Sequence, residues 1–171
     1  MIFETARHSL FPHCHSLRSS TMYHLPTLFI ALLTFVSGLR VLAQTQNTTT
    51  LGYDTSYDNP DLSLNNVACS NGANGLETKY PMYTTLGELP SFPNVGGVFT
   101  VEGWNSAQCG TCYAVTYGST TVYILAVDKS TNGFTVSQEA MDTLTGGNAV
   151  EFGRVNVSFA VADVSACKLP Y

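Results

Sequence analysis

Apolar and polar residues alternate most regularly in the C-terminal half of the chain. Residues 113–117 (Tyr-Ala-Val-Thr-Tyr) have the period of two that is typical of a strand, and the turn Gly118-Ser119 follows them. Residues 121–127 (Thr-Val-Tyr-Ile-Leu-Ala-Val) are almost continuously apolar. This pattern predicts a hairpin whose second strand is buried on both faces. A further strand is expected at 155–161, and a turn leading into a strand at 94–101.

Helical spacing occurs in one clear place, between Val136 and Leu144. Ser137 can cap a helix there, Glu139 falls in its first turn, and Gly146-Gly147 stops it. A second, short helix is expected around 85–89. With no repeat and no internal linker, the pattern predicts one mostly β domain with about six strands and one or two short helices.

The first 43 residues are expected to be a leader outside this domain. The apolar run 25–36 is too short to span a bilayer, and small or apolar residues precede Gln44. We interpret it as a secretory signal peptide cut after Ala43, with Met22 as the start; the alternative is an N-terminal membrane anchor. Residues 44–50 are then expected to be a flexible tail, with a glycosylation sequon at Asn47, and residues 51–171 the domain.

Charge and histidine content exclude several function classes. Residues 44–171 contain four basic and eleven acidic residues, which gives a net charge of −7. This negative charge argues against a nucleic-acid partner. All four histidines lie in the leader. The remaining chain therefore cannot build a Ser-His-Asp triad, a Cys-His dyad or a histidine-ligated zinc site. No metal or organic cofactor is expected.

Four cysteines remain after the leader, at 69, 109, 112 and 167. In an oxidising compartment they allow three pairings. One closes Cys109 with Cys112 as a redox motif, but the thioredoxin-like βαβ context is missing. The other two join the central pair outward to Cys69 and Cys167, and their long loops favour structural bridges.

Asp128 is the leading candidate for chemistry, because it follows the apolar strand 121–127. At the rim of the core its carboxylate can act as an acid on a glycosidic oxygen, or it can simply bind the backbone amides of the next loop. Hydrolysis also needs a second carboxylate, and no spacing selects one. The candidates are Asp54, Asp58, Glu102 and Asp163.

Aromatic residues with polar tips form a second theme, since such rings lie flat against sugars. They are Tyr53, Tyr57, Tyr80, Tyr83, Tyr113 and Trp104. Most of them are expected to be packing residues. A charged content of 11% suits a neutral carbohydrate better than an ionic ligand.

Several motifs stand in the order and spacing of one known family. They are Tyr53-Asp54, Cys69-Ser-Asn-Gly-x-x-Gly-Leu76, Phe92-Pro-Asn-Val-Gly-Gly97, Gly103-Trp104, Cys109-Gly-Thr-Cys112, Ala126-Val-Asp128 and a last cysteine near the end of the chain. Over nearly all of residues 51–171 the chain resembles the cerato-platanin family. About three extra residues around 82–84, and Tyr113 where a tryptophan is frequent, depart from the family pattern and affect the edge of its groove.

The resemblance implies a six-stranded double-psi β-barrel with the bridges Cys69–Cys109 and Cys112–Cys167. It also implies a carbohydrate-binding groove, to which we assign Tyr53, Asp54, Asn71 and Asp128. Family members are small secreted fungal proteins, monomeric in solution, that self-assemble at interfaces.

By the same resemblance, the expected function is non-catalytic binding of chitin or N-acetylglucosamine oligomers, with cellulose as a further partner, and expansin-like loosening of cell walls. Elicitation of plant defence through a plant receptor is expected too, with the protein in the extracellular space or the fungal wall and no membrane insertion. Two alternatives stay open. One is a surface-active protein without specific sugar binding, and the other an endoglucanase-like hydrolase that uses Asp128.

Overall fold

A computed structural model describes residues 46–170 of the chain. Six strands close into one barrel in the order β1-β5-β2-β4-β3-β6. Their bounds are β1 Asn47–Tyr53, β2 Val95–Val98, β3 Cys112–Tyr117, β4 Thr120–Lys129, β5 Phe134–Val136 and β6 Arg154–Ala162. Strand β1 runs parallel to β5 and β2 parallel to β4, while the other neighbours are antiparallel. The expected six-stranded barrel is confirmed.

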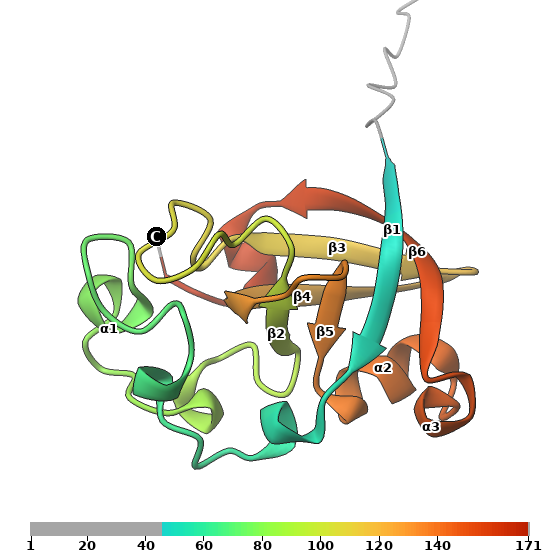
Figure 1. The fold of residues 1–171 in the computed structure, drawn as a ribbon, viewed down its shortest axis with the longest axis horizontal. Coiled ribbons are helices and arrows are strands. Elements are labelled where there is room, and N and C mark those ends of the chain that lie inside the picture. The colour runs from blue at the N-terminus through green and yellow to red at the C-terminus, as the bar shows by residue number, and fades with distance from the viewer. Residues whose placement is uncertain (1–45, 171) are drawn as a thin grey trace, which may run out of the picture. The chain divides into compact units, whose positions relative to one another are not determined.

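Short helical segments fill the connections. The α-helices are α1 Leu76–Lys79, α2 Gln138–Thr145 and α3 Ala149–Phe152, and the 3-10 turns are η1 Thr55–Asp58, η2 Leu64–Asn66, η3 Leu86–Glu88 and η4 Val164–Cys167. Figure 1 shows α1 and the long loops on the left of the barrel, and α2 and α3 at the lower right.

The hairpin and the helix occur where the pattern predicts them. Strands β3 and β4 pair across the Gly118-Ser119 turn, and β4 is buried on both faces from Ile124 to Val127. The Ser137 side chain caps α2 by accepting a hydrogen bond from the Ala140 amide, and Gly146 ends the helix in a left-handed conformation. Because caps and periodicity agree, this helix could be located from the sequence.

The expected flexible tail is wrong for residues 47–50, which form the first half of β1. They pair with residues 156–159 of β6. The run is Asn-Thr-Thr-Thr, whose polar side chains hide any apolar alternation, yet β-branched threonine favours an extended backbone. Residues 44 and 45 of the expected tail, like the expected leader, lie outside the described residues.

The barrel interior is filled by aromatic rings and branched aliphatic side chains. Phe134 packs edge-on against Tyr113 and Phe159, with ring centroids 5.5 and 5.4 Å apart. The Tyr113 ring is almost fully buried, and its hydroxyl lies 2.6 Å from Thr100 Oγ1. Tyr113 is therefore a core residue rather than part of a sugar-binding surface.

Close packing explains the pair of glycines in β2. A Cβ atom on Gly97 would lie 2.7 Å from the Lys129 carbonyl oxygen, and one on Gly96 would collide with the Thr135 carbonyl. A bulge falls between the two residues where β2 pairs with β4. The glycines thus let three strands approach closely beside the end of β4, which carries Asp128.

Candidate functional site

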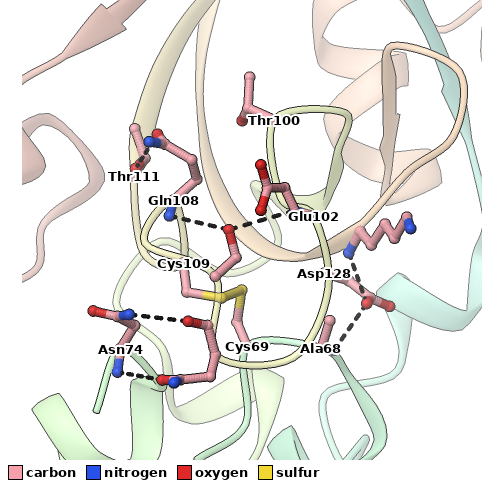
Figure 2. The surroundings of a disulfide bond; sticks show 12 residues. Ala68, Cys69, Asn74, Thr100, Glu102, Gln108, Cys109, Thr111 and Asp128 are labelled. Atoms are coloured by element: carbon pink, nitrogen blue, oxygen red, sulfur yellow. Dashed lines mark hydrogen bonds between the residues drawn. A yellow bond between two sulfur atoms is a disulfide. The ribbon is translucent and has the colours of Figure 1, made fainter. Parts of the chain in front are cut away.

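Asp128 lies half-buried near the end of β4, and both of its carboxylate oxygens are engaged. Oδ1 accepts hydrogen bonds from the Ala68 amide at 2.9 Å and the Lys129 amide at 2.8 Å. Oδ2 accepts one from the Tyr57 hydroxyl at 3.0 Å. Figure 2 shows the two amide contacts beside the disulfide that joins Cys69 and Cys109. The carboxylate therefore ties the end of the strand to the loop before Cys69.

Tyr57 connects Asp128 to Asp54. The tyrosine is buried, and burial together with the negative charge of Asp128 raises the pKa of its hydroxyl, with a smaller contribution from Asp54. The phenol therefore stays protonated and donates its hydrogen to Asp128. The Tyr57 amide also donates to the Asp54 carbonyl oxygen at 3.1 Å, so the backbone of the turn after Asp54 carries the tyrosine that binds Asp128.

Asp54 and Tyr53 lie where β1 ends. Asp54 is exposed and caps η1, with Oδ1 accepting from the Ser56 amide at 2.8 Å. Tyr53 is the last residue of β1, half-buried and opposite Val136 of β5. The sequence motif Tyr53-Asp54 thus marks a strand end beside the Tyr57–Asp128 pair.

Asn71 lies in the loop that follows Ala68. Its Oδ1 atom accepts a hydrogen bond from Trp104 Nε1 at 2.9 Å. Asn71 comes three residues after Ala68, whose amide binds Asp128. The Cα atoms of Ala68 and Asn71 therefore lie at most about 11 Å apart. The structure thus links Asp54 and Asp128 through Tyr57, and Asn71 to Trp104.

Two of the remaining candidate carboxylates, Asp58 and Asp163, bind backbone amides elsewhere in the fold. Asp58 accepts hydrogen bonds from the amides of Gln138 and Glu139 and thereby caps α2. Asp163 caps η4 through the Ser165 amide. Glu102 is exposed, in the loop beside Cys109 (Figure 2). Asp58 and Asp163 thus serve local structure, which their spacing in the sequence did not reveal.

Two disulfides hold the loops to the barrel, and both confirm the expected pairing. Cys69 joins Cys109 across 40 residues, and Cys112 joins Cys167 across 55. All four cysteines are buried. The Cys-x-x-Cys motif is therefore a pair of structural anchors and not a redox centre.

Sequence reasoning missed the partners of the site residues. In the sequence Tyr57 is one of several aromatic residues, and nothing there marks Asn74, whose backbone amide and side chain both donate to Asn105. The sequence Asp54-Thr-Ser56 is typical of a turn in which the Asp side chain accepts from the amide two residues on, and that turn carries Tyr57. No comparable signal identified Asn105, because its role depends on a contact with a loop 31 residues away.

Residues 46–170 show no sign of a metal centre. No group of three or more histidine, cysteine or acidic side chains in that range could hold a metal ion. No helix there is long and apolar enough to cross a membrane. Asn47, the expected glycosylation site, is exposed at the start of β1.

Comparison with known proteins gives consistent matches. The family model described as Cerato-platanin matches residues 49–169. The heat-stable 19 kDa antigen of Coccidioides immitis is 50% identical over 123 residues, which are 72% of this chain and 83% of the antigen. Cerato-platanin of Ceratocystis fimbriata f. sp. platani is 45% identical over 119 residues, 68% of this chain and 84% of its own.

Solved structures agree with the sequence matches. Crystalline cerato-platanin 1 from M. perniciosa superposes with a TM-score of 0.66 at 48% identity, covering 70% of this chain and 98% of its own. The solution structure of the fungal elicitor Cerato-Platanin gives a TM-score of 0.62 at 45% identity, covering 69% of this chain and 95% of its own. The barrel, the two disulfides and these matches agree, and the chain belongs to the cerato-platanin family.

Proposed function

We propose that this is a secreted, non-catalytic carbohydrate-binding protein that takes chitin or N-acetylglucosamine oligomers, with cellulose as a further partner. Binding would displace contacts between polysaccharide chains and so loosen the wall without cleaving it. Tyr53, Asp54, Asn71 and Asp128 form the binding face in this proposal. The protein would act in the extracellular space or in the fungal wall.

The observation that carries the proposal is the pair of carboxylates around Tyr57. Asp128 is fixed by two backbone amides and one phenol, and Asp54 is fixed by its own turn. Preorganised acceptors of this kind suit sugar hydroxyls and acetamido N–H groups, because little ordering is needed on binding.

The same contacts support binding over hydrolysis. A glycosidase acid must hold a proton and donate it to the leaving oxygen. Within the part of the chain that the structure describes, Asp128 accepts hydrogen bonds from the Tyr57 hydroxyl and from the Ala68 and Lys129 amides. Both oxygens of Asp128 are already engaged in accepting these bonds, which favours a role in holding a sugar over proton transfer to a leaving oxygen.

A defence-eliciting role is part of the proposal. Cerato-Platanin, one of the similar solved structures, is described as a fungal elicitor. At 45% identity this chain shares its barrel, and we infer that it too is perceived by a plant receptor.

The proposal is tested by replacing Asp128 with asparagine. The Tyr57 hydroxyl can accept a hydrogen bond from the new amide, so the fold should persist while the charge is lost. Affinity for a chitin tetramer, measured by calorimetry, should fall about tenfold or more, the equivalent of one charge-assisted hydrogen bond. Asp61→Asn, at an exposed carboxylate of another turn, is the matched control.

Unchanged affinity in Asp128→Asn would remove Asp128 from the binding face. A reducing-end assay on the same samples tests the hydrolase alternative. Release of reducing ends by the parent protein and not by Asp128→Asn would replace binding with catalysis as the function.

Surface activity is the second candidate function. Large apolar side chains are exposed on several elements, namely Met82, Phe99, Trp104, Tyr123, Val150, Phe152 and Val161. Phe99 and Val161 also border an open hollow of about 660 Å³ on the barrel wall. Foaming and film formation that persist in a protein without measurable sugar affinity would favour this function and self-assembly at interfaces.

A further inference from the structure

Trp104 is the single tryptophan of the 171-residue chain, and it is not a core residue. Its side chain is 65% exposed, although it lies only five residues from the buried Cys109. An exposed indole leaves a large apolar surface in water, and a ligand that covers this surface gains free energy from its burial.

The indole is held in a fixed orientation by Asn71. Trp104 Nε1, which can only donate, donates to Asn71 Oδ1 at 2.9 Å. This contact satisfies the polar edge of the ring and leaves its apolar surface exposed. Asn71 is itself exposed, so its amide nitrogen can donate to a ligand beside the ring.

The loop that carries Trp104 is fixed as well. Asn105, with a left-handed φ of 61°, accepts from the Asn74 amide through Oδ1 and from Asn74 Nδ2 through its carbonyl, both at 2.9 Å. Figure 2 shows these two bonds below the Cys69–Cys109 disulfide. Gly72 permits the approach, because a Cβ there would lie 2.7 Å from Asn105 Oδ1. One hydrogen bond therefore orients the ring, and two others hold the loop that carries it.

The surroundings indicate which ligand suits the ring. The side chains that hold it are amides, Asn71 directly and Asn74 and Asn105 through the loop, rather than carboxylates. Neutral amides pair with hydroxyl and acetamido groups, while a flat indole covers the apolar C–H face of a pyranose ring. A cationic ligand would find no carboxylate among these contacts.

We propose that Trp104 is a stacking platform for one pyranose ring of a bound saccharide. The saccharide then runs along residues 68–71 from Trp104 to Asp128, whose carboxylate binds the Ala68 amide. This inference rests on the proposed function and adds to it a contact outside the carboxylate pair.

The single tryptophan makes a direct experiment possible. The protein is titrated with a chitin tetramer while tryptophan emission and its quenching by acrylamide are followed. Stacking should shift the emission to shorter wavelength and reduce quenching, since only Trp104 reports. Trp104→Ala should weaken binding about tenfold, Trp104→Phe less, and Asn71→Ala should weaken it while leaving the ring present.

Tyr123→Ala is the matched control, because Tyr123 is an exposed aromatic residue on β4. It should bind like the parent protein. Calorimetry on the same samples separates the two proposals. Heat of binding without any change in Trp104 emission, and with full affinity in Trp104→Ala, would overturn the platform and leave the proposed function standing. No heat and no emission change in the parent protein would overturn both.

Discussion

The strands of the barrel and the loops between them are held together in different ways. Strands β3, β4 and β6 form long antiparallel ladders over a buried aromatic core. Residues 54–94 and 99–111, which we call the loop face, contain only short helical turns. A disulfide, side-chain caps and the contacts of Asp128 fix the loop face.

The barrel therefore supplies most of the stability, while the candidate binding residues lie mostly on the loop face. Asp54, Asn71 and Trp104 lie on the loop face, and Asp128 is the strand residue that reaches it. The positions of these four side chains thus depend on a few hydrogen bonds and on the Cys69–Cys109 disulfide. Changes to the bonds that hold these four residues should therefore affect sugar binding more than equal losses of stability elsewhere in the molecule.

The largest effect is expected from the disulfides. Removing Cys69–Cys109 or Cys112–Cys167 by paired alanine substitutions should each cost about 4 kcal/mol of unfolding free energy, on the chain-entropy model for loops of this length. Loss of the first should also weaken sugar binding at temperatures where the protein is still folded, while loss of the second should not. Denaturant unfolding measures the loss of stability, and calorimetry measures the loss of sugar affinity. Equal losses of affinity in the two variants would contradict the distinction between loop face and barrel.

A smaller effect is expected at Asp58, whose carboxylate accepts the Gln138 and Glu139 amides at 2.9 and 3.0 Å. Asp58→Ala should lower the unfolding free energy by about 1–2 kcal/mol, since it uncaps α2. Sugar affinity should stay unchanged. Asp61→Ala, at an exposed position, serves as the control in urea unfolding. A binding loss in Asp58→Ala would move this residue into the site.

Tyr57→Phe removes the hydroxyl that binds Asp128, and we expect a loss of about 1 kcal/mol. The substitution should also change how the unfolding free energy depends on pH in the alkaline range. The pKa of Tyr57 is raised in the folded state, so the folded protein holds this proton more tightly. Stability from this group is complete below pH about 10 and falls as the pH rises further.

The parent protein should therefore lose more stability than Tyr57→Phe between pH 9 and pH 11. Thermal unfolding across this range measures it. Parallel curves for the two proteins would show that Tyr57 ionises as in the unfolded chain.

The smallest effect is expected at Glu88, on the exposed surface of η3. Its Oε2 atom accepts from the Thr84 amide and hydroxyl and from the Thr85 amide, and these hydrogen bonds lower the pKa of the carboxyl group. Stability from a lowered carboxyl pKa is present above the unfolded pKa and lost as pH falls through the folded one. Thermal unfolding of Glu88→Gln should therefore show a slightly smaller loss of stability at acid pH than the parent protein. An equal loss in the two proteins would show that these bonds contribute nothing there.

The regular part of the fold could be predicted from the sequence. The hairpin at 113–127, the strand at 155–161 and the helix after Ser137 each combine a clear period with a turn or cap residue. Strand β1 was missed in its first half, because Asn47–Thr50 has no apolar alternation. Strand β5 has three residues and falls below what periodicity detects.

The candidate site was harder to predict. Asp128 could be singled out because it follows an apolar strand. Its contact with backbone amides is confirmed, and its role in a binding site stays a prediction. Its partners Tyr57 and Ala68 lie 71 and 60 residues away, and side-chain contacts over such distances leave no local pattern. The disulfide pairing likewise came from family resemblance, because spacing alone left three arrangements.

The most direct measurement of the central claim is an NMR titration of the isotope-labelled protein with a chitin tetramer, followed long enough to detect cleavage. We predict chemical-shift changes confined to residues around Asp54, Asn71 and Asp128, with the sugar intact and the far strands unaffected. Shifts spread over the barrel, or no shifts at saturating sugar, would contradict the account.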